Sequence, residues 1–190
     1  MRVSFVLVIA TCLFCGQVSA QIAATESIRS LFEFDASNDA SSWNLVNDGV
    51  MGGRSSSQAS VTGSGVMRFQ GFLSLANNGG FASVRSSPRL LGLASGDEIV
   101  LRVKGDGRKY TFNLYTPERR TAFSYQLDFQ TIKDQWQEVR LPVNQFVAHS
   151  FGRPISNLRL NASRVQSLGI LLGDKRQGNF AIEVDWIRVD

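Results

Sequence analysis

The feature that most constrains the fold is a strict alternation of apolar and polar residues in the second half of the chain. It runs through residues 123–130 (FSYQLDFQ), 138–143 (EVRLPV) and 180–186 (FAIEVDW). A period of two places one face of each strand in a core and the other in water, as in antiparallel sheets. At Trp186-Ile187 the apolar phase slips by one residue, which predicts a β-bulge. No stretch of a dozen residues carries a helical period.

Short apolar runs bounded by turn residues predict further strands. They are expected at residues 31–34, 66–75, 81–85, 98–104, 110–116 and 167–172. Turn pairs separate the runs at Asp48-Gly49, Asn78-Gly79, Gly173-Asp174 and Asp106-Gly107, and the last pair predicts a hairpin. About ten antiparallel strands without a helix predict an all-β fold, a β-sandwich of jelly-roll type.

The N-terminus has the pattern of a secretory signal peptide over residues 1–20. Arg2 precedes an apolar run at residues 3–14, and small residues end the segment at Ala20. A retained membrane anchor is the alternative, although a comfortable span needs about 20 apolar residues. We therefore expect an exported protein, periplasmic or secreted, with a short segment at 21–30 and a single domain at 31–190.

Cysteine usage and charge exclude several classes of protein. Cleavage after Ala20 would remove both cysteines, Cys12 and Cys15, and leave no disulfide, thiol nucleophile or cysteine-ligated zinc. The formal net charge is +4, and the basic residues are scattered along the chain. This indicates a solvated surface and no nucleic-acid partner. No second segment is apolar for long enough to cross a membrane.

The chain offers little for catalysis. Its single histidine, His149, serves neither a Ser-His-Asp triad nor most zinc sites. The GxG fragments at 63–65 and 105–107 lack the third glycine of a phosphate loop. Sequence spacing does not single out a pair of carboxylates for glycoside hydrolysis. The candidates are Asp48, Asp128, Glu138, Glu183 and Asp185. We assign no catalytic residue, no cofactor and no metal site.

Two further possibilities stay open at the level of sequence. Asp35 and Asp185 could hold a structural calcium ion if the first and last strands are neighbours. Asn161 begins the sequon Asn-Ala-Ser, which matters only if the protein is exported in a eukaryote.

Two segments rich in glycine and asparagine carry the least ordinary chemistry. They are residues 43–55 (WNLVNDGVMGGRS) and 69–85 (FQGFLSLANNGGFASVR). Paired glycines allow close approach of a ligand, and adjacent polar side chains can bind it. The alternative is a pair of demanding turns that fix sheet register. Trp43 or Trp136 could serve as an aromatic platform, although burial suits each better. The candidate ligand-binding residues are Asn47, Asp48, Arg54, Asn77, Asn78 and Arg85.

These two segments strongly resemble the complex I intermediate-associated protein 30 family. Later blocks agree, at residues 136–142 (WQEVRLP), 167–170 (SLGI) and 184–187 (VDWI), so the resemblance covers roughly residues 31–190. It implies a galactose-binding-like jelly roll. It also implies a function, because the mitochondrial members of the family assist assembly of respiratory complex I as chaperone-like factors without known catalysis.

Three functions compete at this stage. The first is a non-enzymatic binding module that holds a protein partner or a glycan through the glycine- and asparagine-rich loops. The second is an assembly factor for a membrane respiratory complex, which the family suggests but an export signal would oppose. The third, ranked last, is a carbohydrate-active enzyme with two carboxylates facing one cleft.

Overall fold

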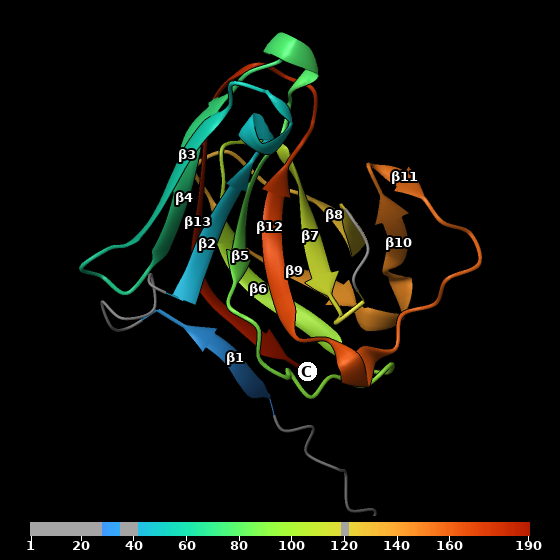
Figure 1. Cartoon of the computed structure of the whole chain (residues 1–190). Helices are drawn as coiled ribbons and strands as arrows, with labels where there is room; N and C mark the ends of the chain where they lie inside the picture. The colour runs from blue at the N-terminus through green and yellow to red at the C-terminus, as the bar shows by residue number, and fades with distance from the viewer. Residues whose placement is uncertain (1–27, 35–41, 119–121) are drawn as a thin grey trace, which may run out of the picture.

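The fold is a sandwich of two antiparallel β-sheets. A computed structural model describes residues 28–34, 42–118 and 122–190 (Figure 1). One sheet has the order β3-β4-β13-β6-β9, with β1 added beside β13. Its strands are β3 (Ser56–Val61), β4 (Met67–Leu73), β13 (Gly178–Val189), β6 (Glu98–Lys104), β9 (Trp136–Pro142) and β1 (Arg29–Glu33). The expectation of an all-β jelly roll is confirmed, with more strands than the ten expected.

The second sheet has the order β11-β10-β8-β7-β12-β5-β2. Its strands are β11 (Arg153–Pro154), β10 (Val147–Ser150), β8 (Phe123–Gln130), β7 (Lys109–Tyr115), β12 (Ser167–Leu172), β5 (Ala82–Ser86) and β2 (Trp43–Asn47). Short 3-10 turns connect some strands: η2 (Asp48–Met51), η3 (Ala76–Asn78), η4 (Val143–Gln145) and η5 (Ala162–Arg164).

The inward side chains of both sheets form one apolar core. Phe69 and Ile182 contribute from the first sheet, and Phe112 and Ile170 contribute from the second; all four are completely buried. Buried residues occupy alternate positions along much of β13, as the period of two predicts. No helix in the described ranges is long and apolar enough to cross a bilayer.

The last strand is the centre of its sheet. β13 pairs with β4 along residues 178–184, with β6 along residues 183–189, and with β1. The register against β6 shifts between Val184 and Trp186, which confirms the bulge expected there. The first and last described strands are therefore neighbours, as a calcium site would require.

The turn at Asp106-Gly107 does not form the predicted hairpin. β6 lies in one sheet and β7 in the other, so this turn carries the chain across the sandwich. Two alternating runs around an Asp-Gly pair look the same in sequence whether the strands pair or separate. The Asp106 carboxylate instead accepts hydrogen bonds from the Arg108 and Ala181 backbone N–H groups, at 3.1 and 3.0 Å.

Candidate functional site

Three loops meet at one end of the sandwich, and we call them together the loop tip. They are residues 48–55, 74–81 and 173–177, which lie between β2 and β3, between β4 and β5, and between β12 and β13. Figure 1 shows the coils of η2 and η3 and the turn after β12 gathered at this end. The two glycine-rich segments singled out in the sequence thus come together in space.

A buried carboxylate joins the first two loops. Asp48 is completely buried, and its oxygens accept hydrogen bonds from Ser55 N at 2.8 Å, Ser55 Oγ at 2.6 Å and Gly80 N at 2.6 Å. Phe81 N adds a longer contact at 3.4 Å. Ser55 Oγ in turn accepts a hydrogen bond from Ser74 N at 3.0 Å. Asp48 therefore holds the two loops together through its hydrogen bonds. Its role as a ligand contact stays a prediction.

The ionised form of Asp48 is favoured inside the protein. Burial by itself raises the pKa of Asp48, but the hydrogen bonds from Ser55, Gly80 and Phe81 outweigh it and hold the pKa below its ordinary value. Glycines make room for this carboxylate: a Cβ added at Gly53 would overlap it, and one at Gly79 would lie 2.5 Å from its Oδ2. The Gly-Gly pairs of the sequence thus fit around Asp48.

We expect Gly53→Ala to lower the free energy of unfolding by about 2–3 kcal/mol, because the added methyl group overlaps the Asp48 carboxylate. The matched control is Gly49→Ala in the same loop, where no atom lies within 4 Å of an added Cβ, and we expect a change within about 0.5 kcal/mol. Urea denaturation followed by tryptophan fluorescence measures both. Equal stability of the two variants would contradict this account of the loop.

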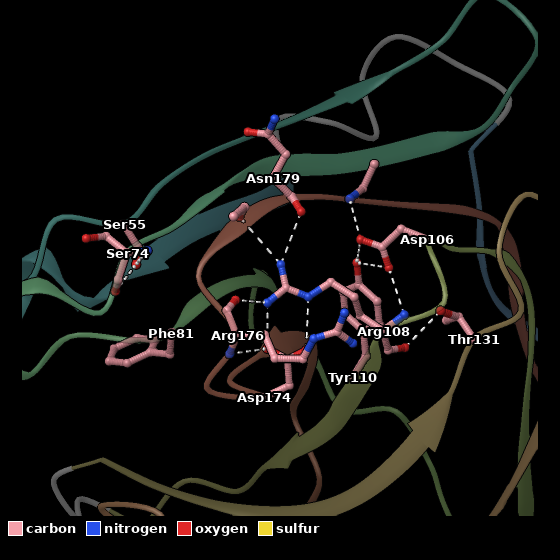
Figure 2. Close-up of polar contacts among 12 residues, drawn as sticks. Ser55, Ser74, Phe81, Asp106, Arg108, Tyr110, Thr131, Asp174, Arg176 and Asn179 are labelled. Carbon is pink, nitrogen blue, oxygen red and sulfur yellow. Dashed lines mark hydrogen bonds and ion pairs between the residues drawn. The ribbon is translucent and has the colours of Figure 1, made fainter.

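A buried ion pair fixes the third loop (Figure 2). Arg108 donates from Nε and Nη2 to the two oxygens of Asp174, at 2.9 and 2.6 Å, and both side chains are almost fully buried. Its remaining donors reach the backbone oxygens of Arg176, Gly178 and Asn179. The hydrogen bond to Asp174 raises the pKa of Arg108. Burial by itself would raise the pKa of Asp174. The hydrogen bond from the Arg108 guanidinium outweighs burial, so the pKa of Asp174 is lowered.

The structure brings five of the six predicted ligand residues to the loop tip or its border. Asn77 and Asn78 have left-handed backbone with φ of 55° and 58°, and Asn77 Nδ2 donates to Gly52 O at 3.1 Å. Asn47 Oδ1 accepts a hydrogen bond from Ser57 Oγ at 2.7 Å, and Arg54 is exposed. The same loops expose three apolar residues that no sequence pattern marked: Val50, Met51 and Leu75 are 72%, 57% and 40% exposed.

Arg85 does not belong to this group. It lies on β5, and its guanidinium carbon is 4.8 Å from the ring centroid of Tyr115 on β7. The intervening strand has Gly169 at this point, where an added Cβ would lie 3.2 Å from Arg85 Cγ. Burial raises the pKa of Tyr115 to about 12, although the nearby guanidinium opposes the change.

A groove of about 650 Å³ lies beside the loop tip, on the outer face of the first sheet. Two rows of paired residues cross β3, β4 and β13 there: Ser56–Phe72–Asn179 and Gln58–Gln70–Ala181. These residues alternate with core residues such as Phe69, which places their side chains on the outside. Phe72 is 40% exposed beside the amides. None of the six predicted ligand residues lines this groove.

The tryptophans differ in their placement. Trp43 is buried against the rings of Phe32 and Phe34, with centroids at 5.0 and 5.8 Å. Trp136 is 38% exposed on β9, under Arg102 and Lys104, and contributes nothing to the loop tip. Phe72 is an exposed aromatic ring near the end of β4, just before the loop at residues 74–81, and it was not among the ligand residues expected from sequence.

Other candidates lie apart. His149 is on β10, where Nδ1 is 2.9 Å from Val147 O. Asp185 pairs with Arg102, and Asp35 lies outside the described residues, so a calcium ion between them stays a prediction. No group of three metal-ligating side chains occurs among the residues that the structure describes. Asn161 is exposed before η5, and its glycosylation also stays a prediction.

Comparison with known proteins gives a family match and distant structural neighbours. A family profile described as complex I intermediate-associated protein 30 matches residues 32–184. The mouse protein named "Complex I intermediate-associated protein 30, mitochondrial" is 32% identical over 98 residues, which cover 48% of this chain and 29% of that protein. A Caenorhabditis elegans relative with the same name prefixed by "Probable" is 32% identical over 97 residues, 48% of this chain and 28% of its own length.

The similar solved structures include carbohydrate-binding modules and an agarase. A family 11 module of a Clostridium thermocellum cellulase has a TM-score of 0.64 at 13% identity and covers 86% of this chain and 94% of its own. A second structure of a family 11 module from that organism, in complex with a mixed-linked tetrasaccharide, has a TM-score of 0.61 at 14% identity, with coverage of 85% and 94%. Such low identity shows a shared fold and nothing about ligands.

The relatives correct one expectation. They are mitochondrial proteins, so the prediction of a periplasmic or secreted protein is wrong. That prediction depended on residues 1–20, which lie outside the described residues. An apolar run followed by small residues is a pattern of composition, and it does not by itself identify a compartment.

Proposed function

We propose that this chain, which belongs to the complex I intermediate-associated protein 30 family, is a non-enzymatic assembly factor that holds a protein partner for a membrane respiratory complex. The names of its relatives refer to intermediates of complex I. The matched part covers less than a third of each of these relatives, so the assembly role is a proposal for this chain.

The observation that carries the proposal is the groove on the outer face of the first sheet. Gln58, Gln70 and Asn179 offer both donors and acceptors, which suit the alternating N–H and C=O groups of an extended peptide. Phe72 supplies an apolar ring for a side chain of that peptide. The Asp106 carboxylate at the edge is already bonded to Arg108 N, Tyr110 Oη and Ala181 N, so it adds no free acid–base group.

Four of the five carboxylates named as possible catalysts are paired or buried, which fits this non-enzymatic function, and Glu138 is exposed on β9. Asp128 pairs with Lys109 at 2.8 Å, Glu183 pairs with Lys104 at 2.6 Å, and Asp48 is buried. A general acid for glycoside hydrolysis needs access to substrate and a raised pKa. The pKa values of Asp48 and Asp128 are lowered despite burial, by hydrogen bonds from Ser55 and Lys109 respectively.

Affinity capture of the full chain from mitochondria tests the proposal. We expect the unaltered chain to recover subunits of complex I intermediates, and Phe72→Ser to recover at least fivefold less, because the ring at the centre of the groove is lost. Trp136→Ser is the matched control, since Trp136 is equally exposed on the same sheet but outside the groove. Recovery of no such subunit, or equal loss in both variants, would contradict the proposal.

A glycan is the second candidate ligand for the same groove, because an exposed ring beside amide groups suits the apolar face and hydroxyls of a sugar. Isothermal titration of the unaltered chain with soluble β-glucan tests it. Binding that Phe72→Ser abolishes would support a glycan partner. If millimolar glycan gives no heat of binding, the glycan is excluded and binding of a protein partner remains as the function of the groove.

A further inference from the structure

We propose that the loop tip docks onto a membrane surface that carries anionic phospholipids. The inference concerns a different surface from the groove and is independent of what the groove holds. It depends on three properties of the loop tip: exposed apolar side chains, unopposed positive charge and a rigid framework.

The apolar side chains protrude from the end of the sandwich. Val50 has the largest exposed fraction of any large hydrophobic residue in the part of the chain that the structure describes, and Met51 follows it in η2. Leu75 lies in the adjacent loop, which is joined to the η2 loop by the hydrogen bond that Asn77 Nδ2 donates to Gly52 O. Its Cδ2 would lie 3.0 Å from a Cβ added at Gly80. Side chains on a convex tip cannot enclose a partner, but they can insert between lipid headgroups.

The charged residues at the loop tip favour an anionic surface. Arg54, Lys175 and Arg176 are all exposed. Lys175 lies beside Leu75, since its Nζ would be 3.7 Å from that same Cβ at Gly80. The three loops contain only two acidic residues, Asp48 and Asp174, and both carboxylates are buried and bonded within the protein. The exposed charge of the loop tip is therefore positive only, which attracts anionic headgroups.

The framework beneath these side chains is fixed by buried charges. Asp48 joins the first two loops through Ser55 and Gly80, and Arg108 holds the third through Asp174. The loops are also joined to each other, because Gln177 Oε1 accepts a hydrogen bond from Leu75 N at 3.2 Å. Rigid loops lose little conformational entropy on binding, so less of the binding free energy of the exposed side chains is lost to ordering the loops.

A partner protein fits these observations less well. Protein interfaces concentrate their energy in aromatic and arginine side chains within a well-packed patch. The exposed large apolar side chains of the loop tip include no aromatic ring, and they come from two loops, Val50 and Met51 from the first and Leu75 from the second. Apolar side chains beside exposed lysine and arginine residues are also found in segments that lie at the membrane interface.

Vesicle binding by the full chain tests the inference. Vesicles of phosphatidylcholine alone are compared with vesicles that contain one quarter phosphatidylglycerol. We expect Val50→Ser with Met51→Ser to weaken binding to the anionic vesicles roughly tenfold, through loss of buried apolar surface. Arg54→Gln with Lys175→Gln should weaken it roughly 25-fold, about fivefold for each cation that is lost. Arg153→Gln with Arg159→Gln removes the same charge elsewhere and should change binding less than twofold.

A local probe separates the loop tip from the apolar N-terminal run. Met51→Trp should show a blue-shifted emission with the anionic vesicles, whereas Leu90→Trp, beyond the opposite end of β5, should not. Both variants share the same N-terminus, so a difference between them reports on the loop tip. An unshifted Met51→Trp spectrum, or vesicle binding that neither tip variant weakens, would overturn the inference. Neither result bears on capture of complex I subunits by the groove.

Discussion

Replacing Arg108 with methionine is expected to lower the free energy of unfolding by about 3–5 kcal/mol. The substitution leaves the Asp174 carboxylate buried without its cation. It also removes the donors that reach the backbone oxygens of Arg176 and Asn179. A buried charge that loses its partner costs far more than the pair itself contributes. Chemical denaturation at neutral pH measures the loss.

Two further variants identify the cause of this loss. Arg102→Met breaks a surface ion pair with Asp185, and we expect a loss within about 1 kcal/mol. Arg108→Met combined with Asp174→Leu removes the buried charge as well, so it should recover part of the stability. If Arg108→Met were no more harmful than Arg102→Met, the third loop of the tip would not depend on the buried pair.

Replacing Asp48 with alanine is expected to cost about 3–5 kcal/mol, because the N–H groups of Ser55 and Gly80 lose a charged acceptor inside the protein. Asp128→Ala is the matched control: its carboxylate also has a lowered pKa, but it is half exposed in a pair with Lys109. We expect that control to lose about 1 kcal/mol or less. Calorimetric unfolding of the three proteins under one condition gives the comparison.

The effect of Asp48 should depend on pH in one direction. Its pKa is lower in the folded than in the unfolded protein, so its stabilisation is complete above the unfolded value of about 4. It is lost as the pH falls through the folded pKa. The difference in unfolding free energy between the unaltered chain and Asp48→Asn should therefore shrink below pH 4. A difference that stays constant down to pH 2 would show that Asp48 does not act as a carboxylate.

Much of the fold follows from sequence because the period of two is a local property. The run 180–186 predicts which face of β13 points inward, and the phase slip at the end of this run predicts the bulge within β13. Both depend on neighbouring residues alone. The route of the chain between sheets is not local. Asp106-Gly107 has the composition of a hairpin turn, yet the strands on either side of it pair with other partners.

The candidate site could be predicted only in part for the same reason. Glycine and asparagine pairs mark demanding turns, so the two segments around Asp48 and Asn77 stand out in sequence. Nothing local marks Arg108 as the partner of Asp174, 66 residues later. The groove requires the register of β3, β4 and β13 to bring Gln58, Gln70 and Asn179 to one face, and register is set by the whole sheet.

The central place of β13 has a consequence for folding during vectorial synthesis. A nascent chain that has emerged only as far as η5 can pair β3 with β4 and β6 with β9, but these two strand pairs have no strand in common. The facing edges of β4 and β6 stay open until Gly178–Val189 is released between them. Any chaperone that acts on the emerging domain must therefore protect two unpaired strand edges through most of its translation.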